Sequence, residues 1–433
     1  MNTLNNILTP RCLLQRDNEG KLWHPTLTKT TNWLIICYLI YSAYLLYFPF
    51  HWPALDQFSH SEFLINYQGG YLRRGLTGEI LLIIERATGL SPLLLIDLIC
   101  VASYLLVCGF FLRQFHRRGL CWWLIFSPFF CGYFFDFIRK DYLLAACLLL
   151  ILYLIRNTRG GHLKVIAVGV IGLLTLMIHE AFLFWGFPMV ILLLFHRKGY
   201  RIDAAILTLF LLAIFLIQCY FKGDASYIQP IVESWHPRYS QDLTINEPGA
   251  IGAIGWEAKD TFLIHLQINF FCPSFKGSTI LFRILFLILI YYFLTNFNYL
   301  FSPSKFGRHS RNALSYTYIF SFICMLPMFT ILSCDFGRNY TYLTYASFGS
   351  YLLFGTERIA SLFPDWYKRS VDSFNTWLFK FIPPSRGLMW LLLLFVAITP
   401  VGCSADGVFY YSIAGYLSRA LLTILSHIFP IAV

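Results

Sequence analysis

Long runs of apolar residues, broken by short polar stretches, follow one another along almost the whole chain. Runs of about twenty such residues predict membrane-crossing helices, because only a helix or a closed barrel satisfies its own backbone hydrogen bonds inside a bilayer. The alternating pattern of a membrane barrel is absent. We therefore expect an all-α fold, a polytopic transmembrane helical bundle of about 11–12 spans. The expected spans are 33–50, 91–112, 120–138, 142–155, 165–178, 181–195, 203–221, 279–300, 313–333, 340–356 and 388–402, with a weaker one at 408–430.

The composition also points to a membrane protein. Of the 433 residues, 58% are hydrophobic and 13% are charged, whereas a soluble domain carries about a quarter charged residues. Residues 1–32 are polar and mixed in charge, without a small-residue cleavage site, so the first apolar run is expected to be an uncleaved signal anchor. We expect a cytoplasmic N-terminal segment at 1–32 and a single polytopic membrane domain at 33–433.

Several common kinds of site have no signature in this chain. The twelve cysteines include no C-x-x-C pair, which argues against a zinc or redox site. No phosphate-binding P-loop and no G-x-G-x-x-G after a strand is present. His179-Glu180 does not begin an H-E-x-x-H motif, because Leu183 stands where the second histidine would be. We expect no metal, no cofactor and no nucleic-acid partner.

Basic residues distinguish the two sides of the expected bundle. If the N-terminus is cytoplasmic and the spans alternate, every short inner loop is basic, as cytoplasmic loops usually are. The longer inner loop, 357–387, contains Lys368 and Arg369 and is expected to contact anionic lipid. The main outer segments are 51–90 and 222–277. A long outer loop such as 222–277 is often a lid or a binding loop. A plain connector with interfacial tryptophans is equally compatible with this sequence.

The first outer segment contains the most distinctive motif, Tyr67-Gln68-Gly69-Gly70-Tyr71-Leu72-Arg73-Arg74-Gly75-Leu76-Thr77-Gly78-Glu79. Arginine guanidinium groups fit phosphate oxygens, and glycines allow a backbone to approach a ligand closely. The motif therefore suggests an anion site at the membrane surface. The alternative is a glycine-rich turn followed by arginines that reach the lipid headgroups. The candidate substrate-binding residues here are Gly69, Gly70, Arg73, Arg74 and Glu79.

Three more charged motifs fall at outer ends of expected spans, between apolar segments. Each alone is compatible with helix-end charges reaching the headgroups. Together, because ionisable groups at membrane depth usually face a bundle interior, they predict a shared polar cavity open to the outside. The motifs are Arg139-Lys140-Asp141, His179-Glu180 and Asp335-Phe336-Gly337-Arg338.

Such a cavity fits a sugar carried on a polyprenyl phosphate or pyrophosphate. Cations aimed at the phosphate oxygens stabilise the charge that develops when the glycosidic bond breaks. A base must also take a proton from the acceptor hydroxyl. The candidate bases are His179 and Glu180, with Asp335 and Asp141 as alternatives. The candidate cations are Arg73, Arg74, Arg139, Lys140 and Arg338.

The Arg-Arg-Gly-Leu turn, Arg-Lys-Asp, His-Glu and Asp-x-Gly-Arg motifs, on this pattern of spans, resemble the bacterial O-antigen and capsular repeat-unit polymerases and the wider set of polyprenyl-linked glycan transferases. The resemblance implies transfer of a glycan from undecaprenyl pyrophosphate on the periplasmic face of the inner membrane, with the outer arginines as functional residues. It implies lipid-linked oligosaccharide, membrane lipids and other polysaccharide assembly proteins, such as a chain-length regulator, as partners. This chain departs from that pattern by having one long outer loop rather than two.

Two alternatives remain. Type-C glycosyltransferases carry an acidic residue in the first outer loop and often need a metal, and this loop offers only Asp56 and Glu62, with no adjacent acid. A transporter or flippase of lipid-linked sugars would bind with the same arginines. Such a transporter should also carry functional charges on inner helix ends, where this chain shows ordinary basic loops.

Overall fold

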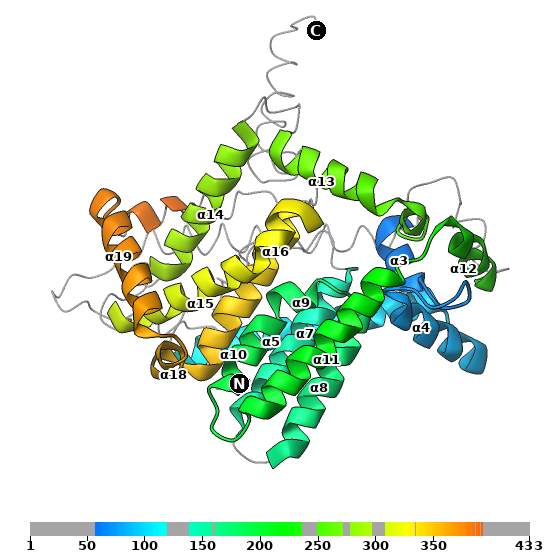
Figure 1. Ribbon diagram of the computed structural model, residues 1–433, viewed down its shortest axis with the longest axis horizontal. Coiled ribbons are helices and arrows are strands. Elements are labelled where there is room, and N and C mark those ends of the chain that lie inside the picture. Colours follow the sequence, from blue (N-terminus) through cyan, green and yellow to red (C-terminus); the bar gives the residue numbers. More distant parts are fainter. Residues whose placement is uncertain are drawn as a thin grey trace, which may run out of the picture.

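The computed structural model describes residues 57–118, 138–157, 161–235, 249–271, 278–296, 308–333, 335–385, 387–389 and 391–392. Within these ranges all regular structure is helical (Figure 1). The expected spans 33–50 and 408–430, nearly all of 120–138 and most of 388–402 lie outside the described residues, as do 1–32, Asp56 and residues 236–248 of the second outer segment.

The α-helices vary from single turns to full membrane length. Two π-helical turns, Met328–Leu332 and Tyr345–Gly349, and two 3-10 turns, Ala225–Tyr227 and Gly252–Gly255, lie between them. The α-helices are α3 (Gln57–Leu64), α4 (Gly75–Thr88), α5 (Pro92–Arg118), α7 (Lys140–Arg156), α8 (Gly161–Ile178), α9 (Phe182–Trp185), α10 (Phe187–Phe195), α11 (Arg201–Tyr220), α12 (Ile228–Ser234), α13 (Ala258–Phe271), α14 (Ser278–Asn296), α15 (Arg308–Pro327), α16 (Phe336–Thr344), α17 (Ser350–Phe354), α18 (Thr356–Ser361) and α19 (Asp365–Phe381).

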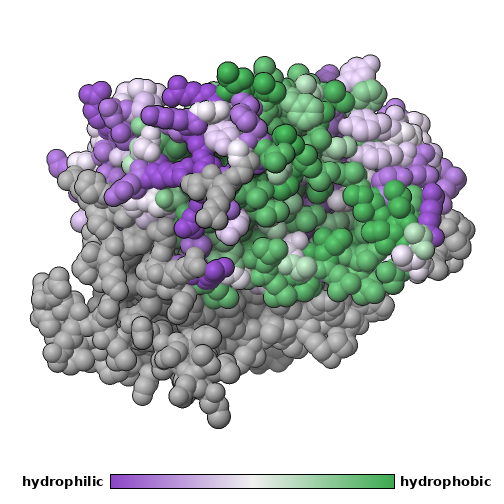
Figure 2. Space-filling view, turned by 90° about the horizontal axis from the view of Figure 1, so that it is seen from below, coloured by the Kyte–Doolittle hydropathy of each residue, from purple (hydrophilic) through white to green (hydrophobic). Residues whose placement is uncertain are grey.

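Among the described residues, four helical stretches are long and apolar enough to cross a membrane, and each coincides with an expected span. Their outward surfaces are apolar, with Leu98 and Leu209 more than half exposed. Figure 2 shows one face of the molecule, on which apolar residues gather in a broad region with hydrophilic residues to either side. Such a surface suits contact with lipid, which indicates a membrane protein that is helical throughout its described regular structure. The four stretches are Pro92–Gln114, Gly161–Ile178, Arg201–Tyr220 and Arg311–Leu332.

The bundle has two chemically different ends. The chain reverses between α7 and α8 and between α10 and α11 at one end, where Arg197 Nη1 donates to the Ile155 carbonyl oxygen at 2.8 Å and His162 Nδ1 lies 2.8 Å from Asp203 Oδ2. We call this the basic end. The start of α7 and the last residue of α8 meet at the opposite end, the site end. The basic end gathers Arg156, Lys164, Arg197, Lys198, Arg201 and Arg358.

One helical segment is buried although many of its side chains are polar. It runs without a break from α16 through the second π-helical turn into α17 and packs against α7 and α15. Thr341, Thr344, Ser347 and Ser350 are all buried in it. Ser347 Oγ donates to the Leu343 carbonyl oxygen in its own helix at 2.6 Å, a way for a hydroxyl to be satisfied without water.

The stretch predicted as one span at 181–195 is two short helices, α9 and α10. Gly186 lies between them, where an added Cβ would come within 2.3 Å of the Phe182 ring. Pro188 follows in the first turn of α10, where its missing N–H is harmless. The expected span is thus interrupted at one residue, a break that hydropathy does not register.

Candidate functional site

The glycine-rich turn after α3 is held by α4 and by the second outer segment. The Glu79 carboxylate accepts the Tyr67 N–H at 3.0 Å, which fastens the turn to α4. A Cβ on Gly69 would lie 2.9 Å from Tyr227 Cα, and one on Gly70 would lie 3.0 Å from the Tyr227 ring. Packing against Tyr227 thus accounts for both glycines, and a ligand role for them and for Glu79 stays a prediction.

Arg74 ends this turn in an uncommon backbone conformation. Its φ of 66° makes it the only non-glycine residue in the left-handed region within the described part of the chain. That conformation costs an arginine of the order of 1 kcal/mol. It directs the guanidinium at Glu180, whose Oε2 accepts from Arg74 Nε at 2.8 Å while Oε1 accepts from Nη2. Arg73 Nη1 lies 3.4 Å from the same Oε1, so two arginines converge on one carboxylate.

His179 follows the last residue of α8 and faces inward. The Ala181 N–H donates to its Nδ1 at 3.2 Å, so the ring hydrogen of the neutral form lies on Nε2. Nε2 in turn is 3.5 Å from Glu62 Oε1. Burial lowers the pKa of His179 to about 3. The histidine is therefore neutral at ordinary pH and presents an N–H to Glu62.

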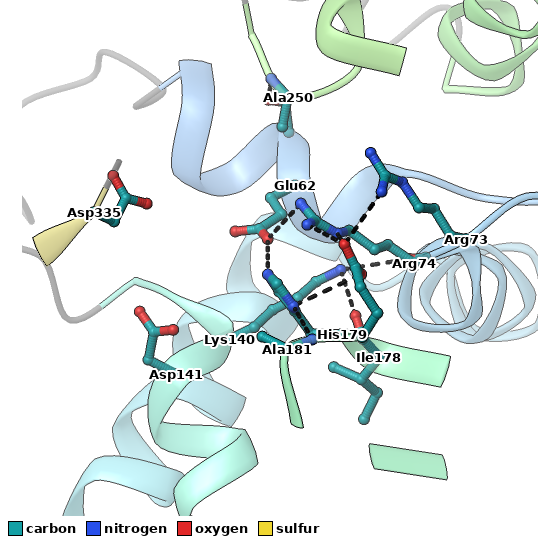
Figure 3. A network of polar contacts seen from close by, with 12 residues as sticks. Glu62, Arg73, Arg74, Lys140, Asp141, Ile178, His179, Ala181, Ala250 and Asp335 are labelled. Carbon is teal, nitrogen blue, oxygen red and sulfur yellow. Dashed lines mark hydrogen bonds and ion pairs between the residues drawn. The ribbon is translucent and has the colours of Figure 1, made fainter. Parts of the chain in front are cut away.

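Glu62 lies at the centre of the network, on α3 (Figure 3). The residue is 1% exposed, and neither carboxylate oxygen accepts a hydrogen bond among the described residues. Arg74 Nη1 is 3.7 Å from Oε1. Burial alone would raise the pKa of Glu62, but the charges of Arg338, Lys140 and Arg74 outweigh it and lower the pKa to about 2. Glu62 is thus a buried, ionised carboxylate without a fixed donor.

Lys140 joins three separate segments at the site end. Its Nζ donates to the carbonyl oxygens of Arg74 and Ile178, both at 3.4 Å, and lies 5.6 Å from the centre of the Phe63 ring. The residue is fully buried. Lys140 therefore fixes the Arg74 turn against the end of α8 and adds a positive charge beside Glu62.

A second charged cluster adjoins the first through Asp141. Arg338 donates to the Asp141 carboxylate from Nε at 3.0 Å and from Nη2 at 2.9 Å, and its Nη1 donates to Asp335 Oδ2 at 2.9 Å. Tyr342 donates its hydroxyl to Asp141 as well and stacks on Trp185 with ring centroids 4.6 Å apart. All the strong donors around Asp141 are thus fixed, and the cluster resembles a structural clamp more than an open site.

The second outer segment covers α3. Trp235 Nε1 donates to the Leu64 carbonyl oxygen at 2.9 Å, and the Ala250 N–H donates to Ser61 Oγ at 2.9 Å. Asn66 Nδ2 donates to Ser234 Oγ at 2.7 Å. Residues nearly two hundred positions from α3 in the chain therefore close over the buried carboxylate.

The four motifs chosen from the sequence do come together at the site end. Arg73, Arg74, His179, Glu180 and Lys140 surround Glu62, and the second cluster contains Asp141, Asp335 and Arg338. Arg139 is buried beside Lys140, and its carbonyl oxygen lies 3.8 Å from Cys100 Sγ.

The sequence predicts a role for Glu62 only in the type-C alternative, as an acid of the first outer loop. The signal that could have selected it is the polar run Ser59-His60-Ser61-Glu62, flanked by Phe58 and Phe63. All four of its side chains are buried, and His60 lies 3.5 Å from Asp97, the acid expected within the second span.

The buried groups predict that the protein loses stability on acidification. For His179 the folded pKa is about 3 against 6.5 when unfolded, and for Glu62 it is about 2 against 4.5. Between the folded and unfolded pKa of each group, the unfolded chain binds the extra proton. The free energy of unfolding therefore decreases as the pH is lowered, by about 1.4 kcal/mol per pH unit for each such proton. We expect the melting temperature in detergent to fall from below pH 6.5 and more steeply below pH 4.5.

The matched variants for that measurement are His179→Gln and His196→Gln. His196 is exposed at the basic end, so its replacement should leave the pH profile unchanged, while His179→Gln should flatten the part between pH 6.5 and 4.5. A profile that is identical in all three proteins would contradict a buried neutral His179.

Comparison with known proteins finds no matching family model, no matching curated protein and no matching solved structure. Among the described residues there is also no group of three or more His, Cys, Asp or Glu side chains placed to hold a metal ion. The chemistry of the site must therefore be argued from its own side chains.

Proposed function

We propose that this protein is a membrane glycosyltransferase that joins polyprenyl-pyrophosphate-linked glycan units, as in the synthesis of O-antigen or capsule. The observation that carries the proposal is Glu62, an ionised carboxylate in a ring of cations with no hydrogen-bond donor of its own among the described residues. The proposal includes a bundle of about 11–12 spans and a polar cavity that opens at the site end.

Glu62 is the best-placed base among the carboxylates of the site. Glu180 is held by Arg74 and Arg73, and Asp141 by Arg338 and Tyr342. A carboxylate fixed by guanidinium forks is a poor proton acceptor, because protonation would break those bonds. His179 accepts a hydrogen bond at Nδ1 and carries its hydrogen on Nε2, so it orients Glu62 and does not compete with it.

Binding of a pyrophosphate would raise the basicity of Glu62. In the resting site its pKa is low because cations surround it. Two phosphate groups bound at Arg73 and Arg74 would bring negative charge close to Glu62 and offset part of the effect of Arg338, Lys140 and Arg74, so that burial, which favours the protonated carboxyl, counts for more. The base thus becomes effective when the donor substrate is bound, and stays ionised and inert when it is not.

Arg73 is the guanidinium most accessible to a substrate. Its side chain is 40% exposed, against 9% for Arg338, and among the described residues its charge partner is Glu180, at 3.4 Å. The Glu180 carboxylate occupies the position between two arginines where a phosphate oxygen would bind, so the substrate has to displace it. Aligned arginines at that position typically stabilise the departing pyrophosphate by a few kcal/mol.

The reaction balances with these groups alone. The acceptor hydroxyl gives its proton to Glu62 as its oxygen forms a bond to the anomeric carbon of the donor. The bond between that carbon and the pyrophosphate oxygen breaks, and the pyrophosphate keeps the electron pair beside Arg73 and Arg74. The proton then leaves Glu62 for solvent, and the polyprenyl pyrophosphate departs along the membrane.

The charge asymmetry of the bundle supports one orientation of the proposed enzyme. Lysines and arginines outnumber the acids at the basic end, which the positive-inside rule assigns to the cytoplasm. The site end then faces the periplasm of a bacterial inner membrane, where finished lipid-linked units are polymerised. A chain-length regulator is the expected protein partner.

The test is the glycan profile of cells that lack the protein, resolved on a gel, with wild type and Arg73→Ala restored from a plasmid. We expect single lipid-linked repeat units without a ladder in the deletion strain and a full ladder with wild type. Arg73→Ala should shorten or remove the ladder at unchanged protein abundance, because this side chain is exposed and supports no other contact. Complete units trapped on the cytoplasmic leaflet would show a transporter instead.

A type-C transferase that adds one sugar is the second candidate, and the position of Glu62 in the first outer segment favours it. Two readouts separate it from a polymerase. The deletion strain would then contain a repeat unit shortened by one sugar. Membranes treated with a chelator would also lose activity if a metal is required, whereas the polymerase is expected to be indifferent.

A further inference from the structure

Helix α19, at the basic end, has an unusual distribution of polar and apolar residues. Its inward face makes hydrogen bonds to α14 and α15. Asn375 accepts from the Tyr291 hydroxyl and donates to Ser315 Oγ at 3.2 Å, and Asp372 accepts from the Tyr316 hydroxyl at 2.9 Å. The helix is therefore held rigidly to the bundle through buried polar contacts.

The outward face of α19 is aromatic. Trp366 is 65% exposed, Trp377 56% and Phe381 68%, with Phe374 at 37% between them. Steps of eight, three and four residues place all four on one stripe of the helix. The rings of Phe374 and Trp377 are stacked, 6.0 Å apart. A stripe of large aromatic side chains is not stable facing water and indicates contact with a partner or a membrane.

The orientation of α19 relative to α15 bears on whether the aromatic stripe can contact a membrane. Tyr367 of α19 contacts the Tyr316 carbonyl oxygen of α15, and Phe379 of α19 contacts Arg311 of α15. The two positions are more than three turns apart on α19 but little more than one turn apart on α15. The two helices therefore cross steeply, and α19 runs along one edge of the molecule (Figure 1). Since α15 belongs to the membrane-crossing stretch Arg311–Leu332, α19 lies close to the membrane plane.

The charges of α19 suit an anionic surface. Arg369 and Lys380 flank the aromatic stripe, while Lys368 lies on the other side of the helix, and Arg358 belongs to the same basic end. Of the two acids on the helix, Asp365 pairs with Lys368 at 2.6 Å and Asp372 is bonded to Tyr316. Arg369 and Lys380 are thus available to lipid phosphates, which attract lysine and arginine side chains near an anionic bilayer.

We propose that α19 is a membrane-interface helix, and that anionic phospholipid in the leaflet at the basic end is its partner. Trp366, Phe374, Trp377 and Phe381 lie at the boundary between headgroups and acyl chains, where tryptophan is most favourable. Arg369 and Lys380 bind the phosphates of the same leaflet. This inference does not depend on the glycosyl-transfer reaction.

The test uses the full chain in nanodiscs. The chain has 11 tryptophans, so the signal of one is obtained by subtracting the emission of Trp366→Phe or Trp377→Phe from that of wild type. We expect lipids brominated near the glycerol to quench both signals more strongly than aqueous acrylamide does. Trp185→Phe is the control, since that ring is fully buried in protein and should show little quenching by either.

Two results would overturn the proposal. Stronger quenching by acrylamide would place the stripe in water, and no quenching by either reagent would mean that another polypeptide covers it. The lipid charge is tested separately, by melting in anionic and in zwitterionic nanodiscs. Arg369→Gln/Lys380→Gln should lose at least half of the stabilisation given by anionic lipid, while Lys259→Gln, an exposed lysine on α13, should keep it. An undiminished effect in the double variant would remove the anionic part of the claim.

Discussion

Glu62→Gln is expected to abolish chain growth, with turnover lowered by roughly a hundred- to ten-thousand-fold. The amide has the shape of the carboxyl group but cannot take the acceptor proton. No hydrogen-bond donor among the described residues is stranded by the change, because Glu62 accepts none. The protein should therefore still be found in the membrane, with some loss of stability from the missing negative charge among Arg338, Lys140 and Arg74.

The measurement is the glycan ladder at matched protein abundance. Glu62→Asp, which keeps the charge on a shorter side chain, should retain a weak ladder and so separates loss of the base from loss of charge. Glu257→Gln removes an exposed carboxylate from the second outer segment and should behave as wild type. A normal ladder from Glu62→Gln would show that this carboxylate takes no proton in the reaction.

Arg338→Ala is expected to remove the protein and not only its activity. Arg338 is 8% exposed and satisfies both Asp141 and Asp335. Breaking such a pair leaves a buried charge uncompensated, at a cost of about 3–5 kcal/mol. That cost is a large part of the roughly 5–15 kcal/mol by which proteins are stable, so membrane abundance should fall severalfold.

Replacing both partners tests this account. Asp141→Leu/Arg338→Met removes both charges together, and it should restore much of the abundance and melting temperature lost by the single variants. If the repaired protein also makes a ladder, the pair is structural; if it is stable and inactive, the pair also serves the reaction. An Arg338→Ala protein as abundant and as heat-stable as wild type would contradict the clamp.

Hydropathy predicted the apolar helices well because lipid contact is recorded in every residue of such a helix. The stretches 91–112, 165–178, 203–221 and 313–333 all coincide with membrane-length helices. Their alternation also placed the charged motifs at one end. The pairing of Arg74 with Glu180 across 106 residues, inferred only as a shared cavity, follows from that alternation.

The role of each carboxylate could not be predicted in the same way. Asp141, Glu180 and Glu62 are all acids at the edges of apolar segments, and nothing local tells them apart. Their difference arises from which donors reach them, and those donors come from distant segments: Arg338 for Asp141 and Arg74 for Glu180. Glu62 differs because no hydrogen-bond donor among the described residues reaches its carboxylate, and only the fold determines which donors come close.

The polar helical segment formed by α16 and α17 has a consequence for insertion of the chain into the membrane. Its buried threonines and serines make it a poor candidate for insertion from the translocon by its own hydropathy. Its insertion therefore relies on α7 and α15, which precede it in the chain and whose surfaces receive it. Until then Asp141, synthesised some two hundred residues earlier than Arg338, lacks its counter-charge. We therefore expect membrane proteases to degrade chains that end before this segment, because their Asp141 has no counter-charge. Synthesis of α16 and α17 would then be required for a stable protein.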